Sequence, residues 1–367
     1  MKFNDLKKQN KNLSKKFVNI LQKKIKNSDF IGGKSVKDFE KNFAKFTNSK
    51  YCLGVGNGTD AIYIALKALN ISFGDEIITT NHSWISTIET IVACGAKPVI
   101  VDTKNNFLID EDKIEKCINK KTKAIMVVHL YGNACEMDKI SKIAHKHKLP
   151  LIEDCAQAHG CKFNEIHVGN FGHFGTFSFF PGKNLGCLGD GGAIISNKKK
   201  FITKARKIAN HGGLKKNSHV YFGMNSRLDS LQADFLNLKL NNLENLNKKR
   251  LNIANIYTTN LANIKEIKLP KIEKNITHVF HQFVVKVKNR KNLMNYLSKN
   301  KIPTGIHYPK LFNNVDYYKK YMKFKIKELK NSNSYEKNIL SLPIHPYLTK
   351  KDVLEVCGKI KNFYKYF

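Results

Sequence analysis

Short apolar segments alternate with amphipathic segments of helical length through the first half of the chain, and this rhythm constrains the fold more than any other feature. Residues 76–80, 124–128 and 151–154 have the composition of buried strands, and helical patterns lie between them at 85–94 and 137–147. Strands that alternate with helices are typical of an α/β fold. We therefore predict a mostly parallel mixed sheet that is flanked by helices.

The C-terminal part has a different order of predicted strands and helices. A long helical pattern at about 230–259 leads out of the part that forms the sheet. After it we predict a strand, a helix, a second strand and a final helix, at 279–287, 293–299, 302–307 and 352–363. The sequence thus predicts a large α/β domain with an N-terminal helical arm over 1–235. A linking helix and a smaller α+β domain are predicted over 236–367.

The sequence predicts neither export nor membrane insertion. No apolar run approaches the roughly 20 residues that a membrane span needs. The first residues, Met1-Lys-Phe-Asn-Asp-Leu-Lys-Lys8, lack the apolar core of a signal peptide. The eight cysteines form no CxxC pair, which suits reduced thiols. We expect a cytoplasmic protein with no membrane partner.

A formal net charge of +35 invites comparison with nucleic-acid-binding proteins. Such proteins use arginine for bidentate contacts to phosphate and guanine, yet only four of the 64 basic residues here are arginine. The lysines are also spread over the whole length. This pattern indicates a compositional bias, and we expect no nucleic-acid partner. A basic nucleic-acid-binding protein on an inactive scaffold remains the alternative from another functional class.

Lys183 differs from the other lysines in its surroundings. A predicted apolar strand at 176–180 is broken by Pro181-Gly182, and four glycines follow the lysine within nine positions. A lysine held in a dry, glycine-lined turn loses its proton readily and can act as an amine nucleophile. The alternative is an ordinary loop lysine beside a glycine-rich turn.

Two further features follow predicted strands. Gly56-Asn-Gly-Thr-Asp60 opens an apolar helix, with Thr59 or Asp60 near its cap, and a helix start presents free N–H groups to an anion. Its spacing is neither that of a P-loop nor that of a dinucleotide fingerprint. Asp154 ends the strand at 151–154. A capped helix start without a ligand and a helix-capping aspartate are the alternatives.

A lysine amine, a strand-end carboxylate and an anion-binding helix start are together what pyridoxal 5'-phosphate requires. The lysine binds the cofactor covalently, the carboxylate keeps the pyridine nitrogen protonated, and the helix start takes the phosphate. Trp84, the only tryptophan, can stack on the cofactor ring, or pack in the core. Ser178 can donate to the phosphate, or be an ordinary strand serine.

At this point the chain resembles the DegT/DnrJ/StrS-type sugar-nucleotide aminotransferases, which have the aspartate-aminotransferase-like fold. The resemblance extends from Phe3 to about Leu348. It rests on ordered motifs: Gly56-Asn-Gly-Thr-Asp60, Thr122-Lys-Ala-Ile125, His129-Leu-Tyr-Gly132, Ile152-Glu-Asp-Cys-Ala-Gln-Ala-His-Gly160, Ser178-Phe-Phe-Pro-Gly-Lys183, Gly189-Asp-Gly-Gly192 and Asn225-Ser-Arg-Leu-Asp229.

The resemblance implies a role for each matching residue. Lys183 and Asp154 would be catalytic, and no metal is expected. The cofactor would be bound by Gly58, Thr59, Trp84, Asp154, Gln157, Ser178, Lys183 and Asn225. Gln157 would contact the ring hydroxyl, and Asn225 would reach the phosphate of the neighbouring subunit in a homodimer.

The resemblance also implies the substrates. Arg227, His307 and Tyr308 would face a nucleotide sugar, although an ion pair with Asp229 is an alternative for Arg227. Relatives that dehydrate sugars carry histidine where this chain has Lys183, so transamination is favoured, with glutamate as the amino donor. The residues from Asn184 to Gly192 look more like those of enzymes that aminate C3 than C4 of a keto-hexose. The expected route is surface glycan biosynthesis, with a 4-keto sugar as the alternative acceptor.

Overall fold

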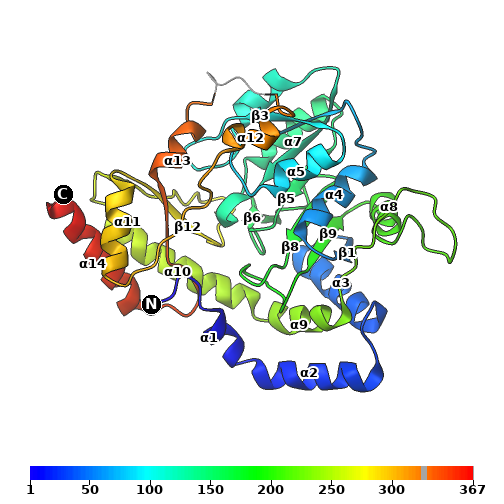
Figure 1. The fold of residues 1–367 in the computed structure, drawn as a ribbon, viewed down its shortest axis with the longest axis horizontal. Helices are drawn as coiled ribbons and strands as arrows, with labels where there is room; N and C mark the ends of the chain where they lie inside the picture. The colour runs from blue at the N-terminus through cyan, green and yellow to red at the C-terminus, as the bar shows by residue number, and fades with distance from the viewer. Residues whose placement is uncertain (324–328, 367) are drawn as a thin grey trace.

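The computed structural model describes residues 1–323 and 329–366, and a seven-stranded sheet lies at its centre (Figure 1). The strands run in the order β1 (Tyr51–Val55), β9 (Gly192–Ser196), β8 (Phe174–Ser178), β5 (Leu151–Asp154), β4 (Thr122–Val128), β2 (Glu76–Thr80) and β3 (Lys97–Val101). The five strands from β8 to β3 are parallel, and β9 is antiparallel to both β8 and β1. The predicted mostly parallel α/β sheet is confirmed.

Both faces of this sheet are buried, and successive side chains of a strand point to opposite faces. On β4, Ile125 and Val127 belong to one core cluster, whereas Ala124 and Met126 belong to the other. Strand side chains alternate in direction, so a continuous apolar run supplies both cores. The covering helices are α3 (Gly33–Thr47), α4 (Gly58–Ala68), α5 (Ser86–Ala93), α7 (Met137–Lys146) and α8 (Lys199–Ala209), and α9 (Ser230–Leu240) packs on α3.

A C-terminal unit is built around a small antiparallel sheet of order β10-β12-β13. Its elements are α10 (Leu243–Leu261), β10 (Ile267–Lys268), β12 (Phe283–Val287), α11 (Arg290–Lys299), β13 (Ile339–Leu342) and α14 (Lys350–Tyr366). A separate cluster of buried side chains, among them Tyr257, Phe283 and Val356, forms its core. A third, short sheet joins β11 (Ile276–Thr277), β6 (Lys162–Phe163) and β7 (Ile166–His167).

The remaining elements are the N-terminal helices and several short helices and turns. They are α1 (Leu6–Lys11), α2 (Ser14–Asn27), α6 (Glu111–Ile114), α12 (Asp316–Lys319), α13 (Tyr335–Asn338) and the 3₁₀ turns Glu115–Cys117, Leu130–Gly132, Phe312–Asn314 and Ser332–Ser334. Among the described helices, none combines the length and the apolar character needed to cross a bilayer.

Two predicted elements are wrong. The helix expected at 230–259 is two helices, α9 and α10, which are interrupted at Asn241-Asn242. Asparagine side chains compete for backbone hydrogen bonds and favour helix ends. The strand expected at 302–307 is reduced to one isolated bridge between Gly305 and Ser341, and β13 supplies the pairing partner of β12 instead. The domain boundary predicted after residue 235 falls within α9.

Candidate active site

A cavity of about 740 Å³ opens where β2, β4, β5 and β8 end. The C-terminal unit lines one side of it with His307, Tyr308 and Ile344. Ligands of α/β proteins bind at the carboxyl ends of the strands. Most of the predicted site residues line this cavity: Gly58, Thr59, Trp84, Asp154, Gln157, Ser178, Lys183, His307 and Tyr308.

Lys183 follows β8 in a turn that neighbouring elements hold in place. Its backbone N–H donates to the Phe180 carbonyl at 2.9 Å. The side-chain amide of Asn184 donates to Asn247 Oδ1 at 2.9 Å and to the Val279 carbonyl at 3.1 Å. Burial of the amine lowers the pKa of Lys183 to about 8, against the opposing charge of Asp154. Roughly a tenth of such an amine is unprotonated at pH 7.

Asp154 ends β5 and is buried, with 5% of its surface exposed. Its Oδ1 accepts from the Ala156 N–H at 3.0 Å, and its Oδ2 lies 3.5 Å from the Thr87 hydroxyl. Burial raises the pKa of Asp154, and the Ala156 hydrogen bond and the charge of Lys183 oppose that rise. A cationic ring nitrogen in the cavity would compensate the buried charge of this carboxylate.

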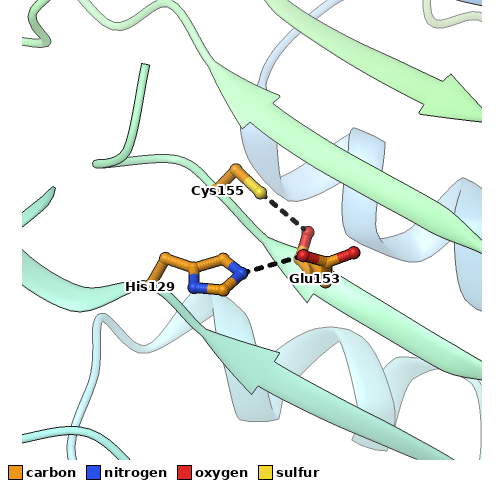
Figure 2. A group of neighbouring side chains, drawn as sticks. All are labelled: His129, Glu153 and Cys155. Carbon is orange, nitrogen blue, oxygen red and sulfur yellow. Dashed lines mark hydrogen bonds and ion pairs between the residues drawn. The ribbon is translucent and has the colours of Figure 1, made fainter. Parts of the chain in front are cut away.

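Glu153, His129 and Cys155 form a buried cluster on the other side of the same strand end (Figure 2). Glu153 accepts from the N–H groups of Gly169 and Gly172, each at 2.7 Å, and from His129 Nε2 at 3.0 Å. Its carboxylate is therefore satisfied by hydrogen bonds from the protein.

The same cluster has the residue types of a metal site, but its other ligand atoms are also engaged. The Cys135 N–H donates to His129 Nδ1 at 3.2 Å, which leaves the proton of this ring on Nε2 for Glu153. Burial raises the pKa of Cys155 well above its usual value, and its thiol lies 3.6 Å from the Glu153 carbonyl oxygen. We interpret the cluster as a structural support for the end of β5.

The start of α4 lines the cavity, with Gly58 and Thr59 in its first turn. Its N-cap is Asn57, whose side chain accepts from the Asp60 N–H at 2.8 Å, so Thr59 and Asp60 lie near the cap as expected, in the first turn of the helix. A side-chain carbon at Gly58 would lie 2.6 Å from Ser178 Cβ, so only glycine allows the helix start to approach β8 this closely. The Thr59 hydroxyl lies 2.8 Å from the hydroxyl of Ser86.

Gln157 connects the sheet to the C-terminal unit. Its Oε1 accepts from the Tyr131 N–H at 2.6 Å, and its Nε2 donates to the Tyr308 hydroxyl at 2.8 Å. The Tyr131 hydroxyl donates to the His307 carbonyl. Trp84 lies against Tyr308, with 5.3 Å between the ring centroids, and 57% of its surface is exposed. Residues from three strand ends and from the C-terminal unit thus meet at one wall.

Asn225 and Arg227 lie outside the cavity, with exposed side chains on the segment before α9. Ser226, between them, donates to Asp60 Oδ2 at 2.6 Å and accepts from the Gly56 N–H at 3.0 Å. The segment is therefore anchored beside the start of α4, while its two predicted site residues face outward.

Sequence reasoning missed several lining residues: Phe3, Asn4, Asn57, Ser86, Phe180 and His281. Asn57 and Ser86 had a usable signal, because each lies at the start of a helix that follows a strand. His281 had none, because its neighbour Asn184, 3.1 Å from its Nδ1, is far away in the sequence.

The residues at the cavity fit pyridoxal phosphate. The free N–H groups at the start of α4, with Thr59 and Ser178, would hold the phosphate; Asp154 would hold the ring nitrogen, and Lys183 the reactive carbon. When bound, this cofactor withdraws electrons from the donor's Cα. The Lys183 amine, with its lowered pKa, is suited to take up and return the Cα proton.

The lowered pKa of Lys183 predicts a pH profile for cofactor binding. Only the unprotonated amine attacks an aldehyde, so the rate at which cofactor-free protein combines with pyridoxal phosphate should rise with pH and level off above about 8. Stopped-flow absorbance measures this rate. In Asp154→Asn the midpoint should move to lower pH, because the negative charge that raises the pKa is gone. A rate that still rises steeply towards pH 10.5 would contradict the assignment.

The Glu153 cluster predicts a loss of stability without any role for a metal. In Glu153→Gln an amide N–H group replaces one carboxylate oxygen, so a buried backbone N–H loses its acceptor and faces another donor. The free energy of unfolding should therefore fall by about 3 kcal/mol. Urea unfolding followed by circular dichroism measures the change. The control is Glu165→Gln, at a side chain that is 85% exposed, with a change below about 0.5 kcal/mol. A chelator that destabilised the wild type to the same extent would favour a metal site.

Comparisons with known proteins bear on this site directly. The profile of the DegT/DnrJ/EryC1/StrS aminotransferase family matches residues 11–361. The chain is 40% identical to dTDP-3-amino-3,6-dideoxy-α-D-galactopyranose transaminase of Aneurinibacillus thermoaerophilus, over 98% of this chain and 99% of that protein. It is 36% identical to UDP-2-acetamido-2-deoxy-3-oxo-D-glucuronate aminotransferase of Pseudomonas aeruginosa, over 99% and 100%.

A solved structure agrees with this match. The crystal structure of DesV from S. venezuelae, in complex with a ketimine intermediate, superposes with a TM-score of 0.96 at 33% identity, over 99% of this chain and 98% of that one. The chain therefore belongs to the DegT/DnrJ/EryC1/StrS aminotransferase family and is a pyridoxal-phosphate-dependent aminotransferase.

Proposed function

We propose that this aminotransferase moves an amino group from glutamate to a nucleotide-linked keto-hexose, on a route to surface glycan. The observation that carries the proposal is the cavity itself. Lys183 and Asp154 line it together with Phe180, His307 and Tyr308, which have no expected part in binding the cofactor. A cavity of about 740 Å³ accommodates an acceptor of this size beside the cofactor.

Amination at C3 is favoured over C4. The two relatives described above carry a 3-amino and a 3-oxo sugar in their names. The loop from Asn184 to Asp190, which suggested C3 in the sequence, approaches the cavity through Asp190. Gln232 holds this loop, because it accepts from the Leu188 N–H at 2.9 Å and donates to the Leu188 carbonyl at 3.2 Å.

A homodimer would complete the site. Asn225 and Arg227 face outward from their own chain, and exposed apolar side chains lie nearby. Phe30 and Ile31 are 52% and 54% exposed, and they pair with the start of α9 through Ser230 and Asp229. A second copy that covers this strip would bury the apolar surface and bring the two polar side chains to its neighbour.

A cytoplasmic location is consistent with the cysteines. Cys52, Cys94 and Cys155 are buried free thiols, and burial raises the pKa of each. Buried thiols that form no disulfide suit a reducing compartment.

The proposal predicts the product of a defined assay. Purified protein is incubated with pyridoxal phosphate, glutamate and a panel of acceptors: UDP-2-acetamido-2-deoxy-3-oxo-D-glucuronate, the 3-keto precursor of dTDP-3-amino-3,6-dideoxygalactose, and a dTDP-4-keto-6-deoxyhexose. Mass spectrometry and NMR should detect a 3-amino sugar nucleotide. Lys183→Ala should lower the rate at least a thousandfold, because the covalent link and the proton carrier are lost.

The other results of this assay discriminate between the alternatives. A 4-amino product would show that the enzyme aminates C4 of the acceptor and not C3. Salt-dependent retention of DNA or RNA, with no cofactor absorbance and no amination, would favour the nucleic-acid-binding alternative.

Subunit mixing tests the homodimer. Lys183→Ala and Asn225→Ala chains should each form weakly active dimers. Refolded together in equal amounts, they should recover about a quarter of wild-type activity, since half the dimers are mixed and each holds one intact site. Sedimentation velocity checks the assembly. If Asn225 served its own chain, mixing would restore nothing.

A further inference from the structure

We propose that the N-terminal residues Phe3 and Asn4 form part of the acceptor site and act as specificity-determining residues for the sugar. This inference rests on the proposed function, because it concerns the acceptor of that reaction. Both residues line the cavity that contains Lys183. Neither is among the residues expected to hold the cofactor.

Asn4 lies against the turn that carries the reactive lysine. Its Nδ2 donates to the Gly182 carbonyl at 3.3 Å, one residue before Lys183. A side-chain carbon at Gly182 would lie 3.7 Å from the same nitrogen, so the amide packs directly on the backbone of the turn. A ligand group that reaches Lys183 from this side would pass the carboxamide.

Phe3 lies against the C-terminal unit. Its ring stacks on His307, with 5.7 Å between centroids and 23° between planes. His307 is itself fixed, because its Nδ1 lies 2.8 Å from the Ser341 hydroxyl on β13 and its carbonyl accepts from Tyr131. Phe3 and Asn4 therefore bridge the two sides of the cavity, from His307 to the lysine turn.

Contacts on either side hold this segment in place. Lys2 and Asp5 form an ion pair at 3.6 Å, and Asp5 caps α1 by accepting from the Lys8 N–H at 3.0 Å. The Lys8 amine donates to the Tyr347 carbonyl at 3.4 Å, just before α14. Figure 1 shows the N-terminus on the side of the molecule that carries α10 and α14. Such anchoring keeps Phe3 and Asn4 at the cavity before any ligand arrives.

The chemistry of the pair suits a hexose. The C–H groups of a pyranose ring pack on an aromatic face, and its hydroxyls exchange hydrogen bonds with a carboxamide, which can both donate and accept. The anion-binding start of α4 and the carboxylate of Asp154 lie in other elements of the cavity. We therefore expect Phe3 and Asn4 to contact the keto-sugar and to leave the amino donor unaffected.

Separate measurement of the two half-reactions tests this assignment. Phe3→Ala and Asn4→Ala are compared with wild type for the visible absorbance change on adding glutamate alone, and for steady-state amination of each panel sugar nucleotide that wild type accepts. The glutamate step should stay within twofold. The KM for the sugar nucleotide should rise about tenfold in each variant, with kcat changed less than threefold.

Matched variants exclude a general effect of altering this segment. Lys7→Ala changes an exposed side chain of α1 outside the cavity and should behave as wild type. Phe3→Tyr keeps the ring and should restore the KM. Cofactor absorbance and the melting temperature report folding, and Asn4→Ala removes no core side chain.

The inference is overturned if both alanine variants keep the wild-type KM, or if the glutamate step falls as much as the amination step. If wild type converts no panel member but still reacts with glutamate, the proposed acceptor class fails, and this inference fails with it. A wild-type protein that aminates the panel while the variants match it would refute the role of Phe3 and Asn4 alone.

Discussion

Two adjacent carboxylates end the buried strand β5, and the organisation of the site depends on the difference in their hydrogen bonding. Glu153 accepts hydrogen bonds from two backbone N–H groups and from His129, so its carboxylate oxygens have partners within the protein. Asp154 points to the other face and receives one backbone hydrogen bond. Its capacity to accept further hydrogen bonds is directed into the cavity, which Asp154 lines. One strand end thus contributes both a structural anchor and a carboxylate that lines the cavity.

The position of Lys183 follows from the same strand. β5 and β8 are parallel neighbours, with Asp154 paired to Thr176, so the chain leaving β8 enters the cavity on the same edge. Burial favours the neutral form of the amine and lowers its pKa. The charge of Asp154 opposes this effect. The balance gives a lysine that exchanges a proton near neutral pH, as a proton carrier in this reaction requires.

The parts that could be predicted from sequence are those that depend on local pattern. The strand at 151–154 and the positions of Lys183 and Asp154 follow from apolar runs and turn residues, and the structure agrees. The role of Glu153 could not be predicted. Its partners Gly169 and Gly172 donate backbone N–H groups, and every residue except proline has such a group, so the sequence does not indicate which of them bind a carboxylate. The break at Asn241-Asn242 could not be predicted, because asparagine lowers the helix propensity only slightly and also occurs within helices.

Trp84 is the only tryptophan of the chain, and it lies at the wall of the cavity beside Tyr308. In most proteins of this size, tryptophan fluorescence averages over several environments. Here all of the indole emission arises from one place, at the wall of the cavity that contains Lys183. The intrinsic fluorescence of the unlabelled protein therefore reports the occupancy of a single site, and ligand binding can be followed without any added dye.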